Sequence, residues 1–151
     1  MWARRGSRPT RLKQTEYDWV YAYGAANPLT GDSLCWLMPT VNTTLMSLYV
    51  ERLSRHVGPK RHIILVLDQA GWHVARDLLV PTNISLLFLP PYSPELNPIE
   101  RSWCYLKQHH LSNRLYADYD ALVAAGSDAW NRLTPQRIQS ICRTAWIKRK
   151  D

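Results

Sequence analysis

The chain has 151 residues, enough for about one domain with a buried core. Its net charge of +7, from 19 basic and 12 acidic residues, fits a nucleic-acid partner and fits an ordinary basic surface equally well. Apolar runs such as residues 63–67 are far shorter than the ~20 residues that span a membrane, and no secretory signal begins the chain. We therefore expect a cytoplasmic protein with no membrane partner.

The first third of the chain predicts a basic arm followed by a hairpin. Residues 1–14 contain five basic residues together with Gly and Pro, and we expect them to form a basic N-terminal arm. Residues 16–26 are rich in Tyr, Trp and Val, which is typical of a strand. A turn sequence follows over residues 27–31, and residues 33–38 then return as the second strand.

The middle of the chain alternates between helical and strand patterns. Asn42 or Thr43 can cap a helix whose apolar residues recur at helical spacing and which Gly58 ends. Beyond it we expect a buried apolar strand, a short helix and a second buried strand, over residues 62–67, 73–79 and 84–89. Right-handed crossovers would bring the two strands side by side or one apart, with their carboxyl ends on one rim.

The last third predicts helices only. They cover residues 98–110 and 119–130, and a last helix begins at Thr134-Pro135, where a cap residue precedes Pro at the first helical position. The inner stripes are expected to be apolar, formed by Ile99, Trp103 and Leu106 in the first of these helices and by Ile138, Ile141, Cys142 and Ala145 in the last. The order of elements predicts a mixed α/β domain.

The three cysteines have no pattern that predicts chemistry. Cys35, Cys104 and Cys142 are far apart and match no zinc-binding spacing. We interpret them as small buried hydrophobic residues in a reducing compartment, rather than as metal ligands or redox groups.

Two acids stand at positions where chemistry is expected. Asp68 ends an apolar strand, and ligands bind at the carboxyl ends of strands in open α/β sheets. Glu100 follows a Pro-rich segment and lies one turn into a helix. Carboxylates brought together from separate elements suit hard divalent cations, and two such ions about 3.5–4 Å apart support phosphoryl transfer. Each acid also has an ordinary interpretation, Asp68 as a turn former and Glu100 as a response to the helix dipole.

Several neighbouring residues suit a nucleic acid. Asn97 would add an amide beside the metal, Lys107 would reach the next phosphate about 10 Å along the helix, and His73 would contact DNA or orient a water. His73 also fits the role of a capping or core residue. Tyr92 could stack on a base, although an aromatic residue tucked under prolines is the preferred account.

Three stretches together closely resemble the transposases of bacterial insertion sequences in the mariner-like superfamily. They are residues 67–73 (Leu-Asp-Gln-Ala-Gly-Trp-His), residues 89–100 (Leu-Pro-Pro-Tyr-Ser-Pro-Glu-Leu-Asn-Pro-Ile-Glu), and Trp103 with Leu106-Lys107. Residues 2–9, and Gly24-Ala25 followed by Thr30-Gly31, also look like segments of that family. The resemblance covers nearly the whole chain.

The resemblance implies a DDE endonuclease with a ribonuclease H-like mixed sheet flanked by helices. Asp68 would be the second acid of the Asp-Asp-Glu triad and Glu100 the third, and the complete family site holds two Mg²⁺ or Mn²⁺ ions. DNA, as transposon ends and target, would be the partner, with Arg4, Arg5 and Arg8 among the residues that bind it. The protein would then be associated with the nucleoid.

One part of the family pattern is missing. The family's first Asp lies on the first, central strand, upstream of the segment that matches residues 2–9. Neither Asp18 nor Asp32, the acids of the first two predicted strands, has the family's setting. We therefore interpret residues 15–151 as a partial DDE endonuclease domain that lacks the central strand.

This gap has two expected consequences. Without a third carboxylate, the isolated chain should have very low activity. Two open sheet edges should promote aggregation or pairing with another chain, either a homo-oligomer or a complementing N-terminal transposase segment. Two other functions stay open: a catalytically silent nucleic-acid-binding remnant, and an acid/base hydrolase that acts on a small substrate.

Overall fold

The protein has a mixed α/β fold, as the order of predicted elements indicated. The structure is a computed structural model that describes residues 19–71 and 73–147. Its strands are β1 (Tyr21–Ala26), β2 (Ser33–Met38), β3 (Ile63–Leu67) and β4 (Ile84–Phe88). Its helices are α1 (Thr43–Val57), α2 (Ile99–Leu106), α3 (Tyr119–Asn131) and α4 (Pro135–Cys142). A short 3-10 turn, η1 (Pro94–Leu96), precedes α2, and a π-helical turn, η2 (Lys107–Leu111), follows it.

The predicted hairpin is confirmed, although its first strand begins at Tyr21, and residues 16–18 of the prediction lie outside the described part of the chain. β1 and β2 pair antiparallel in a register that sets Tyr21 opposite Met38 and Ala26 opposite Ser33. The connecting turn closes with a 2.8 Å hydrogen bond from the Gly31 N–H to the Asn27 carbonyl. Gly31 has a φ of +76°, and a Cβ there would collide with the backbone of Pro135, so both conformation and space require glycine. This turn therefore rests directly on the start of α4.

Helix α1 joins the two pairs of strands in one core. The Asn42 side chain caps it by accepting from the Leu45 N–H at 2.8 Å, so Asn42 rather than Thr43 is the cap. The Tyr49 hydroxyl donates to the Leu34 carbonyl at 2.9 Å and ties the helix to β2. The buried members of this core come from β1, α1, β3 and β4, namely Tyr23, Met46, Tyr49, Val50, Leu67 and Ile84.

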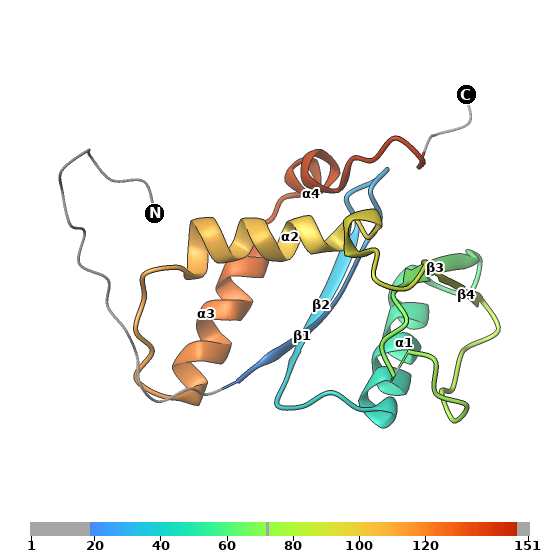
Figure 1. Ribbon diagram of the computed structural model, residues 1–151, viewed down its shortest axis with the longest axis horizontal. Coiled ribbons are helices and arrows are strands. Elements are labelled where there is room, and N and C mark those ends of the chain that lie inside the picture. The colour runs from blue at the N-terminus through green and yellow to red at the C-terminus, as the bar shows by residue number, and fades with distance from the viewer. Residues whose placement is uncertain (1–18, 72, 148–151) are drawn as a thin grey trace.

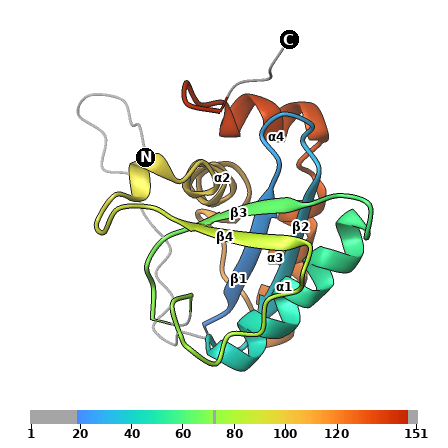
Figure 2. The ribbon, with the colours of Figure 1, turned by 90° about the vertical axis from the view of Figure 1, so that its right-hand side faces the viewer.

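Strands β3 and β4 pair in parallel, as the crossover rule predicted. They form a separate two-stranded sheet, however, and no ladder of hydrogen bonds joins it to the hairpin within the described residues. In Figure 2 this pair runs across the direction of the hairpin. The single mixed sheet expected from the sequence is thus two small sheets that share α1.

Each small sheet has an open edge. In β1, the alternation of the antiparallel ladder turns the backbone groups of Ala22, Gly24 and Ala26 away from β2. In β3, Ile63 and Leu67 bond toward the β4 side, so the backbone groups of Ile64 and Val66 face the other way. These are edges to which a further strand could pair.

The expectation that β3 and β4 are buried on both faces is wrong. One face packs on α1, but the opposite face leaves Ile64 67% exposed and Leu87 49% exposed. None of the helices among the described residues covers these two side chains. The apolar composition of a strand does not reveal whether a second layer is present.

Helices α2, α3 and α4 form a second core on the other side of the hairpin. Figure 1 shows α3 and α1 on opposite sides of β1 and β2. Gly24 of β1 lets the Trp103 ring of α2 approach, because a Cβ at Gly24 would collide with that ring. Trp103 in turn lies against Trp130 of α3, with ring centroids 5.4 Å apart. The buried members of this core are Leu106, Ala129, Leu133, Ile138 and Cys142.

The short helix predicted over residues 73–79 does not form. The segment makes turns, including a 3.1 Å bond from the Leu78 N–H to the Ala75 carbonyl. The Leu79 N–H donates to the Ser47 hydroxyl of α1 rather than to a carbonyl of its own segment. So short a helix needs a buried face to be stable, and Leu79 is largely exposed.

Three smaller expectations need correction or completion. α4 ends at Cys142, so Ala145 lies beyond the helix and is exposed rather than buried. Cys104 is also exposed, whereas Cys142 is buried and Cys35 half-buried, and all three are free. Burial raises the pKa of the Cys35 thiol to about 12, which keeps it protonated and unreactive.

No helix within the described residues is long and apolar enough to cross a membrane.

Candidate acidic site

Asp68 lies one residue beyond β3, at the rim predicted from the sequence. Its Oδ1 accepts from the Ala70 N–H at 3.2 Å and lies 2.5 Å from Nδ1 of His73. The His73 side chain is only 16% exposed, while the Asp68 side chain is 53% exposed. The imidazole therefore holds one oxygen of the carboxylate, and the carboxylate itself faces solvent.

The rim beside Asp68 is held by both strands. The Leu89 N–H, just past β4, donates to the Leu67 carbonyl at 2.8 Å. The Gln69 side-chain amide donates to the Leu89 carbonyl at 2.9 Å. These bonds fix the backbone on either side of Asp68 and thereby its direction.

Glu100 lies in the first turn of α2, which local bonds define. The Glu100 N–H donates to the Asn97 carbonyl at 3.2 Å, and the Asn97 side-chain oxygen accepts from the Ile99 N–H at 3.4 Å. Pro98 precedes the helix with a φ of −61°, already suited to helical backbone. The Pro-rich segment before α2 thus places Glu100 in the first turn of the helix, where a negative charge is favoured.

The two acids lie close enough to affect each other. Partial burial, and after it the negative charge of Asp68, raise the pKa of the Glu100 carboxyl. For the charge of Asp68 to act on Glu100, the two carboxylates must share one local field, although 32 positions separate them in the sequence. Their mutual repulsion is relieved by any cation that binds between them.

The acid pair is not a complete ligand cage. Within residues 19–71 and 73–147, no group of three or more His, Cys, Asp or Glu side chains is arranged to hold a metal ion. Asp32 does not supply a third acid in this arrangement, and its Oδ1 lies 2.8 Å from Nε2 of His56 instead. Asp18 is outside the described residues.

Tyr92 is the aromatic residue whose predicted placement is wrong. It is fully exposed in the loop between β4 and α2, rather than tucked under the prolines. Its φ of +57° is uncommon for a residue with a side chain, and such strain is concentrated at functional sites. Trp103, by contrast, is a core residue as expected.

The other predicted DNA-binding residues fall into three groups. Asn97 is half-buried at the start of α2, beside Glu100. Lys107 is exposed in η2, where the helical register widens. The basic arm over residues 1–14, with Arg4, Arg5 and Arg8, lies outside the described residues.

One contact near the acids was missed by the sequence analysis. The Arg101 guanidinium, adjacent to Glu100, donates to the Arg143 carbonyl at 2.7 Å, across 42 positions. It ties α2 to the segment that follows α4. No local pattern predicts this contact, because it depends on how the two helices pack.

Comparison with known proteins gives the family. The model of the DDE superfamily endonuclease family matches residues 1–123, most of the chain. The chain belongs to the DDE superfamily endonucleases. Within that family, Asp68 and Glu100 fall inside the matched region, and the mixed α/β fold is consistent with such a nuclease domain.

Two relatives illustrate the range of the family. The uncharacterized protein y4pE/y4sA of Sinorhizobium fredii is 43% identical over 133 residues, which cover 87% of this chain and 98% of that protein. The transposable element Tc3 transposase of Caenorhabditis elegans is 29% identical over 104 residues, which cover 66% of this chain but only 31% of the transposase. No solved structure matches the chain.

Proposed function

We propose that this chain is the endonuclease domain of a bacterial insertion-sequence transposase of the mariner-like type, with a ribonuclease H-like fold over residues 15–151. The reaction is cleavage of DNA and transfer of the cut strand, and the protein works at the nucleoid. The observation that carries the proposal is the position of the two acids that the family resemblance singles out, Asp68 just past β3 and Glu100 in the first turn of α2, with the charge of Asp68 among the causes that raise the pKa of Glu100. A match to a transposase supports the same conclusion.

The donor set fits Mg²⁺ or Mn²⁺. Asp68 and Glu100 offer hard carboxylate oxygens, and Mg²⁺ is commonly held by one or two carboxylates while water and substrate phosphates fill its other positions. When bound, two such ions would activate the attacking water or 3′-hydroxyl and stabilise the leaving oxygen. Burial, and after it the negative charge of Asp68, raise the pKa of Glu100, and a cation bound beside the two carboxylates would offset both effects.

The neighbouring residues take supporting roles in this proposal. His73 is a positioning residue, since its Nδ1 fixes one oxygen of Asp68 and leaves the other oxygen for a ligand. Asn97 and Lys107 bind phosphates along α2, and Tyr92 stacks on a base beside the acids. The basic residues Arg4, Arg5 and Arg8 add sequence-independent affinity for the DNA backbone.

The two open sheet edges support a partner strand. β1 and β3 each present backbone groups that no described strand bonds, while both sheets contribute to one core around α1. A complementing N-terminal transposase segment, or a second copy of the chain, would pair at these edges, and the N-terminal segment would also supply a third carboxylate. A monodisperse monomer that melts cooperatively would count against this part of the proposal.

A second candidate is a DNA-binding remnant that does not cut. The specific observation in its favour is that the described residues assemble two carboxylates rather than three at the rim. Both functions require DNA binding that weakens steeply with salt. They differ in whether the acid pair binds a divalent cation.

Mn²⁺ titration of the purified chain tests the proposal. We expect saturable Mn²⁺ binding that is lost in the double variant Asp68→Asn with Glu100→Gln, because both anionic ligands are then neutral. Asp77→Asn is the matched control, since it removes one exposed acid outside the site. Nicking of a DNA substrate should be very weak for the isolated chain.

The outcomes separate the two functions. Equal Mn²⁺ binding by the parent chain and the double variant overturns the proposed metal site and favours the second candidate, the DNA-binding remnant that does not cut. Strong Mn²⁺-dependent nicking that Asp68→Ala abolishes would show instead that the isolated chain is a complete enzyme. Absence of any salt-sensitive DNA binding overturns both candidates.

A further inference from the structure

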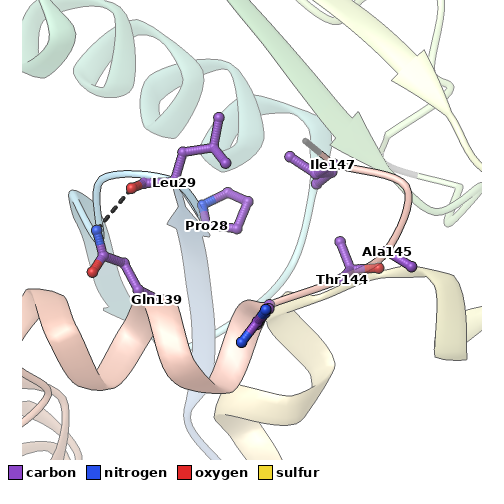
Figure 3. A pocket seen from close by; sticks show the side chains of 7 residues that line it. Pro28, Leu29, Gln139, Thr144, Ala145 and Ile147 are labelled. Carbon is purple, nitrogen blue, oxygen red and sulfur yellow. Dashed lines mark hydrogen bonds between the residues drawn. The ribbon is translucent and has the colours of Figure 1, made fainter. Parts of the chain in front are cut away.

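A hollow of about 640 Å³ lies between the hairpin turn and the segment after α4. Figure 3 shows Pro28 and Leu29 on one wall and Thr144, Ala145 and Ile147 on the other. This volume is within the roughly 300–1,000 Å³ of ligand-binding sites. It is large enough for a nucleotide.

The first wall of the hollow is fixed by contacts between distant parts of the chain. The Gln139 side-chain amide of α4 donates to the Leu29 carbonyl at 2.7 Å, drawn as the dashed line in Figure 3. Gly31 of the same turn rests against Pro135 at the start of α4 with no room for a Cβ. The turn and α4 therefore behave as one rigid wall.

The lining is basic and partly apolar. Its seven residues include Arg143 and contain no carboxylate, so the hollow attracts an anion. Pro28, Leu29, Ala145 and Ile147 offer apolar surface to a sugar or a base, and the Thr144 hydroxyl can bond a phosphate oxygen.

The hollow is linked to the acid pair through α2. Arg101 follows Glu100 in the sequence, and its guanidinium bonds the carbonyl of Arg143, a lining residue. Arg143 therefore lies against the first turn of α2, the turn that carries Glu100.

We propose that this hollow binds unpaired nucleotides of the DNA substrate, next to the phosphate that lies at the acid pair, with Arg143 and Thr144 on the backbone and the apolar wall against a base. The inference rests on the proposed function, since it assumes a DNA substrate at Asp68 and Glu100. A concave site of this size admits one strand rather than a duplex, which is why we specify unpaired nucleotides.

The test compares two DNA probes by fluorescence anisotropy, a blunt duplex and the same duplex with a single-stranded extension. Arg143→Ala should weaken binding of the extended probe roughly fivefold at 0.1 M salt, and lower its salt slope by about 0.7, the value for one contact with a single strand. The blunt duplex should be affected much less. Arg52→Ala, which removes an equal charge from the exposed surface of α1, is the matched control.

A second variant tests the space of the hollow without changing its charge. Ala145→Trp keeps every charge but fills the space, and because Ala145 is exposed beyond α4 the fold should tolerate it. We expect it to lower affinity for the extended probe alone. If Ala145→Trp binds both probes as the parent does, or if Arg143→Ala matches Arg52→Ala, the inference is overturned while the proposed function stands. If the parent chain binds neither probe, the proposed function itself fails.

Discussion

The hairpin and the β3–β4 pair differ in how completely other elements cover them. The β1–β2 hairpin is covered on one face by α1 and on the other by α2 and α3, with close contacts at Gly24 and Gly31. The β3–β4 pair has α1 on one face and leaves Ile64 and Leu87 exposed on the other. Asp68 belongs to the open region and Glu100 to a helix of the covered region, so the acid pair joins the two. The contrast is one of faces rather than edges, because both faces of the hairpin are packed while one face of the β3–β4 pair is bare.

The largest expected effect is at the turn that locks the covered region. Gly31→Ala should cost roughly 1–3 kcal/mol for the positive φ, and roughly 1–3 kcal/mol more because the new Cβ meets the Pro135 backbone. Gly58→Ala is the matched control, with a φ of +86° but no atom within reach, so it should show the first cost alone. Urea denaturation measures the loss in free energy of unfolding for both variants. Equal costs for the two variants would mean that the turn does not press on α4.

A pair of isoleucines tests the contrast in burial. Ile138→Ala in the second core should destabilise by about 2–5 kcal/mol, because Ile138 is 1% exposed and its removal leaves a cavity. Ile64→Ala on the bare face of β3 should change stability by no more than about 0.5 kcal/mol. Thermal melts at two protein concentrations provide the measurement. A large cost for Ile64→Ala that grows with concentration would show that a second copy covers this face.

Tyr92 tests whether the open region contacts DNA. Because the side chain is fully exposed, Tyr92→Ala should leave the melting temperature almost unchanged. It should weaken binding of single-stranded DNA by about 1–3 kcal/mol, the usual contribution of one stacked base. Leu48→Ala is the control, because Leu48 is an exposed apolar residue of α1. Leu29 is also exposed, but it lines the hollow and is therefore unsuitable. Equal affinities for the two variants would remove Tyr92 from the DNA surface.

The smallest effect is the pH dependence at the junction of the two regions. The pKa of Glu100 is raised in the folded chain, so the native state binds more protons than the unfolded state above the ordinary Glu pKa of about 4.3. This contribution to stability is present at low pH and is lost as the pH rises through the folded pKa. Glu100→Gln should therefore raise the melting temperature slightly at pH 7 and not at pH 3. A reversed trend would show that the folded chain favours the charged form of Glu100 and that its pKa is lowered rather than raised.

Local sequence patterns predicted most of the elements because local physics decides them. The hairpin with its Gly31 turn, the Asn42 cap of α1 and the Thr134-Pro135 start of α4 each depend on residues within a few positions. The candidate acids were found for the same reason, since Asp68 ends a strand and Glu100 opens a helix. The failed predictions share a different cause. The helix over residues 73–79, the burial of Ala145 and the placement of Tyr92 all depend on what packs against them.

By itself, the sequence determined the order of strands and helices, the shared rim at the carboxyl ends of β3 and β4, and the two acids with their family. The tertiary structure alone decided that the strands form two sheets with open edges, that one face of β3–β4 stays bare, and that Arg101 reaches the Arg143 carbonyl beside a basic hollow. The reason is physical. Hydrogen bonds and φ preferences act between near neighbours in the chain, whereas layers, edges and hollows arise only when distant segments compete for the same contacts.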